Sequence, residues 1–318
     1  MIQKLLLAKP RGFCAGVDRA IDVVNASLEL FEGPIYVRKE IVHNKHVIDS
    51  LAKKGVVFVE SAEEVPEGGL VIFSAHGVSP EVRAKAAERK LKVVDATCPL
   101  VTKVHLEALR FARDGRFIIL VGHEGHDEVI GTMGEVPGRI ALVGSKEEAE
   151  RIQPPDPERV AVLTQTTLGV DDANEIIAVL RRRFPALAVP SSDDICYATQ
   201  NRQNAVKAIA RQAELVLVIG SENSSNSKRL KEVAEASGAR AHLIDDVSMI
   251  DPEWLEGTTV LGIAAGASAP EHLVQQVVEY FRDNGVREVE EIEVIEERIT
   301  FRPPPELSHE LIERGSLR

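Results

Sequence analysis

The three cysteines of this chain constrain its fold more than any other feature, because each stands where an apolar stretch gives way to a helical pattern. The clearest case is Cys98. The β-branched residues Val93 and Val94 precede it, and Pro99 follows it in a position that suits the first turn of a helix. Apolar residues then recur at helical spacing at Val101, Val104 and Ala108. This pattern predicts a buried strand before Cys98 and a helix after it.

Cys14 and Cys196 have similar surroundings. Cys14 follows the apolar start of the chain, and a helical pattern runs over residues 17–24. Cys196 follows Ile195, and a helical pattern runs over residues 206–213. We therefore expect all three thiols at strand-to-helix turns, where the helix dipole favours a thiolate over a thiol.

The segments after the cysteines repeat one order of elements three times. After each cysteine helix, an apolar strand leads into a polar loop that opens another helix; the strands are residues 34–37, 117–121 and 215–219. The loop residues stand at matching distances from the cysteines: His43 is 29 residues after Cys14, His126 is 28 after Cys98, and Ser224 is 28 after Cys196. Each copy then has a second strand and polar loop, which start at Leu70, Val160 and Val260.

This repeat predicts an α/β fold of three similar βα-repeat domains, at residues 14–96, 97–193 and 194–298. We expect the N-terminal strand (1–13) to join the sheet of the third domain, and residues 299–318 to form an extended tail with a possible short terminal helix. Parallel sheets bind ligands at the carboxyl ends of their strands, where all the polar loops lie. If the domains form a pseudo-threefold trefoil, the cysteines and loops meet in one central cavity.

Composition narrows the classes of protein to which the chain can belong. The formal charge of −12 over 318 residues argues against nucleic acid or an anionic membrane as the main partner. No apolar run approaches the length of a membrane span, and the N-terminus is too short and polar for a signal peptide. We therefore expect a cytoplasmic chain. An odd number of cysteines, three, makes disulfides poor candidates.

The three cysteines leave two metal interpretations and a plain alternative. Structural zinc takes four ligands at short local spacings such as C-x₂-C, which this chain does not have. A 4Fe–4S cluster held by three thiolates leaves one iron without a protein ligand, and that iron can bind substrate. The alternative is three buried, inert cysteines, which are common in proteins. The repeat and the helix N-termini favour the cluster.

The polar loops suit an anion. His43, His76 and His126 occupy corresponding loops, and the third copy has Ser224, Ser225, Asn226 and Ser268 instead. Such donors at helix N-termini suit phosphate. A single histidine is more often an ordinary core or surface residue, and Ser268 with Glu271 also matches a capping box. Thr166 can equally be a turn residue at the end of a strand.

Glu128 is the carboxylate of interest, because it lies two residues after His126 in a loop otherwise suited to anions. As a plain alternative, it is a first-turn acid that interacts with the helix dipole. Burial near a cluster would raise its pKa, which suits a general acid.

Six motifs in order resemble the 4-hydroxy-3-methylbut-2-enyl diphosphate reductase family over nearly the whole chain. They are residues 11–17 (RGFCAGV), 96–101 (ATCPLV), 122–129 (GHEGHDEV), 165–168 (QTTL), 224–227 (SSNS) and 266–270 (GASAP). The family often has proline where this chain has Asp127, which we expect to alter the local turn and not the chemistry.

The resemblance implies a trefoil around one 4Fe–4S cluster held by Cys14, Cys98 and Cys196. It implies a two-electron reductive dehydroxylation that yields isopentenyl and dimethylallyl diphosphates, in the last step of the non-mevalonate pathway. It places Glu128 as proton donor and Thr166 beside the hydroxyl of the substrate. The diphosphate-binding positions that it implies are His43, His76, His126, Ser224, Ser225, Asn226 and Ser268.

Two other classes of protein can use the same parts. Quinolinate synthase has a similar three-cysteine design but catalyses a dehydration without net electron transfer, so the need for an external reductant separates the two. A diphosphate-binding protein with a purely structural cluster would show no reoxidation by substrate. For a reductase we expect an electron donor such as ferredoxin or flavodoxin.

Overall fold

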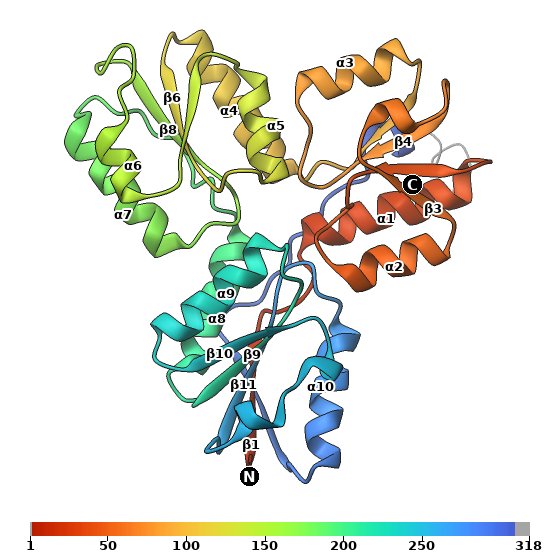
Figure 1. Cartoon of the computed structure of the whole chain (residues 1–318), viewed down its shortest axis with the longest axis vertical. Coiled ribbons are helices and arrows are strands. Elements are labelled where there is room, and N and C mark those ends of the chain that lie inside the picture. The colour runs from red at the N-terminus through yellow and green to blue at the C-terminus, as the bar shows by residue number, and fades with distance from the viewer. Residues whose placement is uncertain (1, 309–318) are drawn as a thin grey trace. The chain divides into compact units, whose positions relative to one another are not determined.

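The structure is a computed structural model that describes residues 2–308 (Figure 1). Its strands form three separate parallel sheets of five, four and three strands, with helices between successive strands. The α/β class expected from the repeat is therefore confirmed. Chain contacts divide it into two compact units, which are described separately: unit 1 is residues 1–15, 43–49 and 197–299, and unit 2 is the remainder.

Unit 2 contains the two smaller sheets. The four-stranded sheet has the order β3-β2-β4-β5, with bounds β2 Ile35–Arg38, β3 Val56–Val59, β4 Leu70–Phe73 and β5 Lys92–Asp95. The helices of this part of the chain are α1 Ala15–Leu30, α3 Pro80–Glu88 and the short η1 Ala62–Glu64. Helix α2 Lys45–Lys53 begins in unit 1 and ends in unit 2. Strand β4 is buried along its whole length, as its unbroken apolar sequence predicts.

The three-stranded sheet has the order β7-β6-β8, with bounds β6 Phe117–Val121, β7 Ile140–Val143 and β8 Val160–Thr164. Its helices are α4 Pro99–Arg113, α5 Asp127–Glu135, α6 Lys146–Arg151 and α7 Val170–Arg183. Alternate residues of β6 and β8 enter two different apolar clusters, one on each face of the sheet. The sheet is thus covered on both sides, as parallel sheets are.

The prediction of a full strand before Cys196 is wrong. Between α7 and Cys196 the described chain pairs only through an isolated bridge from Ala188 to Ala161. The segment 184–196 contains Pro185 and Pro190 followed by a polar run, and proline cannot donate to a ladder of hydrogen bonds.

Unit 1 contains the five-stranded sheet, with the order β10-β9-β11-β1-β12. Its strands are β1 Lys4–Lys9, β9 Leu215–Ile219, β10 Arg240–Ile244, β11 Val260–Ala265 and β12 Glu288–Glu293. Its helices are α8 Tyr197–Ala210, α9 Ser225–Ala236, α10 Glu271–Asp283 and the short η2 Val247–Met249 and η3 Pro252–Leu255. The N-terminal strand β1 lies between β11 and β12 and pairs with both.

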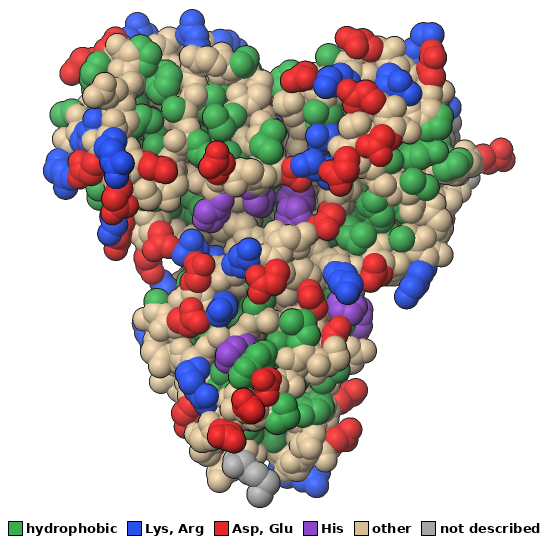
Figure 2. All heavy atoms as spheres, viewed as in Figure 1, with side chains coloured by type: hydrophobic (Ala, Val, Ile, Leu, Met, Phe, Trp, Pro, Cys, Tyr) green, Lys and Arg blue, Asp and Glu red, His purple; other side chains and the backbone are tan. Residues whose placement is uncertain are grey.

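Three further features complete the description. The boundaries of the three domains remain a prediction. Residues 305–308 of the predicted tail are helical, and residues 309–318 lie outside the described residues. Within the described chain, no helix has the length and apolar character that crossing a bilayer requires. On the face drawn in Figure 2, acidic and basic side chains are interspersed.

Candidate active site

Each of the three cysteines directly precedes a helix, as predicted. Cys14 precedes α1, Cys98 is the N-cap of α4 with Pro99 as the first helical residue, and Cys196 precedes α8. All three are half-buried, and within the described chain they form no disulfide. A thiolate at such a position is stabilised by the helix dipole, so all three residues suit metal ligation.

The backbone holds the three cysteines in the same way. The N–H of each cysteine donates to a carbonyl in the polar loop after the second strand of a repeat: Cys14 to Ala267 (3.2 Å), Cys98 to Ala75 (3.0 Å) and Cys196 to Thr166 (3.1 Å). The first bond lies within unit 1, and the other two lie within unit 2. The repeat seen in the sequence therefore extends to the hydrogen bonds that position the cysteines.

Unit 1 contains the loop that opens α9. Ser224 is the N-cap of this helix, Ser225 is its first residue, and Asn226 is 4% exposed. The Oδ1 atom of Asn226 accepts the N–H of Ala267 at 2.8 Å, while its buried Nδ2 donor has no hydrogen-bond partner in the described chain. An amide donor buried without a partner is costly, which favours a ligand acceptor at this point.

Ser268 does not form the capping box that its sequence suggests. Helix α10 begins at Glu271 with Pro270 as its N-cap, so Ser268 lies too early in the chain to cap it. Its Oγ instead donates to the carbonyl of His43 at 2.8 Å. Ser268 therefore anchors the His43 loop within unit 1.

Unit 2 contains the other two histidines. His126 is the N-cap of α5, and its Nδ1 accepts the N–H of Glu128 at 3.3 Å. A neutral ring with an accepting Nδ1 carries its proton on Nε2, where it can donate to an anion. His76 stands edge-on to His126, with ring centroids 5.8 Å apart, and its Nδ1 lies 3.3 Å from Ser74 Oγ. The two rings thus lie together at the N-terminus of α5.

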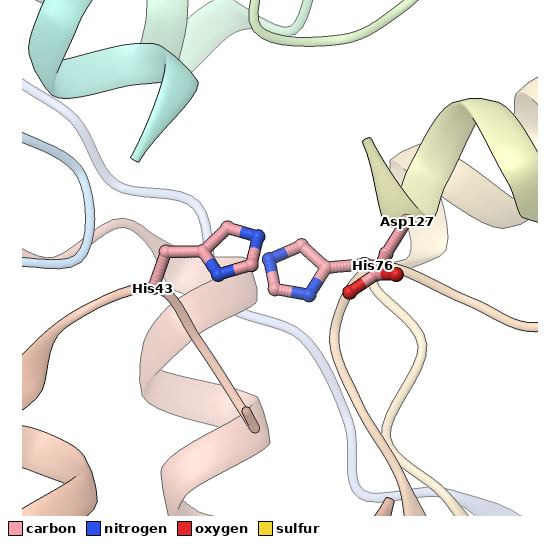
Figure 3. A group of neighbouring side chains, drawn as sticks. All are labelled: His43, His76 and Asp127. Atoms are coloured by element: carbon pink, nitrogen blue, oxygen red, sulfur yellow. The ribbon is translucent and has the colours of Figure 1, made fainter. Parts of the chain in front are cut away.

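Asp127 is the residue at which we expected a change in the local turn. It is the first residue of α5, and its carboxylate forms an ion pair with Lys39. Figure 3 shows the carboxylate beside His76, and the possible ligand atoms of the two residues lie within 4.8 Å of each other. Helix α5 starts here without proline because His126 caps it.

Glu128 is almost completely buried, at 2% exposure. Its Oε1 accepts the N–H of Thr166 at 2.7 Å, and its Oε2 accepts the Thr166 hydroxyl at 2.9 Å. The pKa of Glu128 is raised to about 7, chiefly by burial; the two bonds from Thr166 oppose the rise, and the nearby Asp194 adds to it. Glu128 is therefore a carboxyl group that can hold a proton near neutral pH.

Two side chains near these residues were not predicted from the sequence. Gln165 is 1% exposed. It accepts the N–H of His123 and donates to Thr167, so it links the loop after β8 to the loop before α5. Asp194 is also buried and accepts the N–H of Thr164. Gln165 lies inside the QTTL motif, so the sequence could have pointed to it. Nothing in the sequence pointed to Asp194, because an acidic pair in a polar segment normally faces water.

His105 and His242 lie outside the predicted anion loops, and their contacts are structural. His105 is buried on α4 and pairs with Glu135 at 2.9 Å. The ring of His242 stacks on Trp254 with centroids 3.9 Å apart.

Comparison with known proteins identifies the family. Residues 5–282 match the family model described as LytB protein. The chain is 58% identical over 314 residues to the 4-hydroxy-3-methylbut-2-enyl diphosphate reductase of Acidothermus cellulolyticus, covering 98% of this chain and 92% of the relative. It is 56% identical over 301 residues to a reductase of the same name from Burkholderia mallei, covering 95% and 92%.

Solved structures agree with the sequence comparison. The structure of the E-1-hydroxy-2-methyl-but-2-enyl-4-diphosphate reductase from Plasmodium falciparum matches with a TM-score of 0.96 at 36% identity, over 99% of this chain and 100% of that one. A structure of (E)-4-hydroxy-3-methyl-but-2-enyl diphosphate reductase, the terminal enzyme of the non-mevalonate pathway, matches with a TM-score of 0.63 at 34% identity, covering 89% and 100%. The chain belongs to the LytB family.

Proposed function

We propose that the chain is a reductase that converts (E)-4-hydroxy-3-methylbut-2-enyl diphosphate into isopentenyl and dimethylallyl diphosphates by two-electron reductive dehydroxylation. Its relatives carry the name of this activity over almost their full length. The observation in the structure that best supports it is the buried carboxyl of Glu128, held by Thr166 and able to carry a proton at neutral pH. Loss of a hydroxyl group as water needs such a proton.

The cofactor in this proposal is one 4Fe–4S cluster with Cys14, Cys98 and Cys196 as its ligands and one iron left open. The donor set fits, because each cysteine is half-buried, lies outside a disulfide and stands at a helix N-terminus. When bound, the cluster supplies electrons and an iron that acts as a Lewis acid. We propose that the chain forms three domains, at residues 14–96, 97–193 and 194–298.

The diphosphate-binding residues in this proposal are His43, His76, His126, Ser224, Ser225, Asn226 and Ser268. Two of these donors have the clearest support. Asn226 Nδ2 is a buried donor without a partner in the described chain. The proton on His126 Nε2 follows from the hydrogen bond that Nδ1 accepts from Glu128. Ser268 must turn its hydroxyl away from the carbonyl of His43 to donate to a phosphate oxygen.

Glu128 is the proton donor, and Thr166 positions it. The backbone and the hydroxyl of Thr166 each hold one carboxylate oxygen, so the carboxyl group has a fixed orientation. We propose that Thr166 also lies beside the hydroxyl of the substrate. Its hydroxyl can then accept a proton from Glu128 and donate one to the leaving oxygen.

The reaction needs an electron donor, and we propose a one-electron carrier such as ferredoxin or flavodoxin. We propose a cytoplasmic reaction, because cysteines outside disulfides suit a reducing compartment.

Anaerobically prepared protein tests the function. It should contain iron and sulfide and show a 4Fe–4S signal by low-temperature EPR after reduction. Addition of the substrate to the reduced protein should reoxidise the cluster and release both products. A dehydration that needs no reductant would instead indicate chemistry of the quinolinate synthase kind, and binding without reoxidation would indicate a diphosphate-binding protein.

A further inference from the structure

Each helix that follows a cysteine carries a basic residue in its second turn that contacts the loop before another cysteine. The first is Arg19 on α1, five residues after Cys14. Its Nη1 donates to the carbonyl of Thr97 at 3.0 Å, and Thr97 is the residue directly before Cys98. Its Nε donates to the carbonyl of Arg302 at 2.7 Å. Burial lowers the pKa of Arg19, while the nearby Cys98 and Asp95 oppose this change.

The second basic residue is Lys103 on α4, five residues after Cys98. Its Nζ donates to the carbonyls of Ser192 (2.7 Å) and Asp193 (2.8 Å) and to the Asp194 carboxylate (2.9 Å). These three acceptors lie two to four residues before Cys196. All three donor positions of the ammonium group are thus used on the loop that leads to Cys196.

The third is Arg202 on α8, six residues after Cys196 and only 1% exposed. Its guanidinium donates to the carbonyl of Gly12 at 3.0 and 2.8 Å and to that of Phe13 at 3.1 Å. Gly12 and Phe13 directly precede Cys14. Glu297 balances the charge with an ion pair at 3.1 Å. An arginine buried this deeply is costly unless every donor has a partner, and here the partners are mainly the cysteine loop.

We propose that Arg19, Lys103 and Arg202 are positioning residues for the cluster, each fixing the loop that carries one cysteine ligand and placing a positive charge beside it. This inference rests on the cluster of the proposed function. It follows from the regular pattern of contacts, in which each of the three cysteine helices supplies one cation, and each of the three cysteine loops receives one. The contacts follow chain order. The helix after Cys14 contacts the loop before Cys98, the helix after Cys98 contacts the loop before Cys196, and the helix after Cys196 contacts the loop before Cys14.

The two roles have different physical consequences. Hydrogen bonds to the loop carbonyls fix the loop that carries each cysteine, which should slow the loss of the cluster. The charges favour the reduced cluster, because an added electron makes the cluster more negative. At an effective dielectric constant of about 20, a charge lost about 10 Å from the site of reduction changes the reduction equilibrium by about tenfold.

The test compares Arg19→Met, Lys103→Met and Arg202→Met with the parent, all prepared anaerobically with their cluster. The matched control is Arg113→Met, also on α4, whose Nε contacts the carbonyl of Leu109 in its own helix. Each of the three variants should lower the reduction equilibrium constant about tenfold, which corresponds to about 59 mV for a one-electron couple. Each should also lose iron to a chelator about tenfold faster, while the control matches the parent.

Conservative variants separate charge from geometry. Arg19→Lys should return the midpoint potential to the parent value, and Lys103→Arg should restore both the potential and the resistance to chelator. If Arg202→Met fails to fold, the Arg19 and Lys103 variants decide. If Arg19→Met and Lys103→Met have the midpoint potential and the chelator resistance of the parent, this inference is overturned, even where their melting temperature has fallen. A parent protein that binds no cluster would instead overturn the proposed function, and this inference with it.

Discussion

The substitution Glu128→Gln tests the proton-donor role with little change in shape. The carbonyl oxygen of the substituted side chain can accept the N–H of Thr166 in place of Oε1, and its amide can donate to the Thr166 hydroxyl in place of Oε2. Both hydrogen bonds of the parent are therefore replaced, and the buried site keeps its volume. What the variant lacks is a proton that it can give to the leaving oxygen.

The effect on rate follows from the loss of general acid catalysis. Such catalysis contributes about 10² to 10⁴ in rate, so kcat should fall by that factor while the affinity for the substrate changes little. In the parent, the acid is protonated below its pKa of about 7, so kcat should fall about tenfold per pH unit above this value. The residual rate of the variant should lack this fall.

The same pKa has a consequence for stability. Burial raises the pKa of Glu128 from its ordinary value of 4.5 to about 7, so the contribution of this group to stability is fully present below pH 4.5 and is lost as the pH rises to 7. The loss amounts to about 3 kcal/mol. Glutamine does not titrate, so the free energy of unfolding of the variant relative to the parent should increase by this amount between pH 4.5 and pH 7.

Two measurements on the same pair of proteins decide the matter. Single-turnover reoxidation of the reduced cluster by substrate gives the rate as a function of pH, and denaturant unfolding at about pH 4.5 and about pH 7.5, on either side of the titration, gives the relative stability. A variant that turns over at the parent rate with its cluster intact would refute the role of Glu128 as the acid. Equal stability differences at both pH values would refute the raised pKa.

Three further changes have definite expected results. Cys98→Ser should lose the cluster or its activity, as measured by iron content and EPR, and full activity in this variant would contradict the ligand assignment. Asn226→Ala should weaken the binding of inorganic diphosphate about tenfold, because it removes a donor, as measured by calorimetry. Asn226→Asp should weaken it about a hundredfold, because it also places a carboxylate that repels the ligand. Thr166→Ala removes a hydrogen bond that lowers the pKa of Glu128, so the alkaline fall in kcat should move to higher pH, whereas Thr166→Ser should leave it in place.

Local patterns were sufficient to predict the elements that carry the site. The cysteine positions, the helices after them and the polar loops at the strand ends all follow from apolar periodicity and from residues such as Pro99, which act within a few positions. The raised pKa of Glu128 was also expected from burial, and the structure buries this residue in the first turn of α5.

Contacts between distant parts of the chain could not be predicted in this way. Ser268 satisfies the capping pattern with Glu271, but its hydroxyl bonds to His43, 225 residues away. The sequence predicts a surface position for Asp194, but in the structure its carboxylate accepts hydrogen bonds from Lys103 and from the N–H of Thr164. Propensity describes how a residue acts on its own neighbours in sequence, and it contains no information on which distant backbone group lacks a partner.

The repeat also places a different functional group at one of three equivalent positions in the sequence. The residue 30 positions after each cysteine is buried in all three copies: Asn44, Glu128 and Asn226 are 0%, 2% and 4% exposed. Glu128 and Asn226 use the same contact, an acceptor oxygen on a backbone N–H of the second loop, from Thr166 and Ala267. Asn44 and Asn226 keep an amide donor without a partner in the described chain, while Glu128 has a second oxygen that can hold a proton. One of the three equivalent positions therefore offers an acid, and the other two offer neutral amide donors.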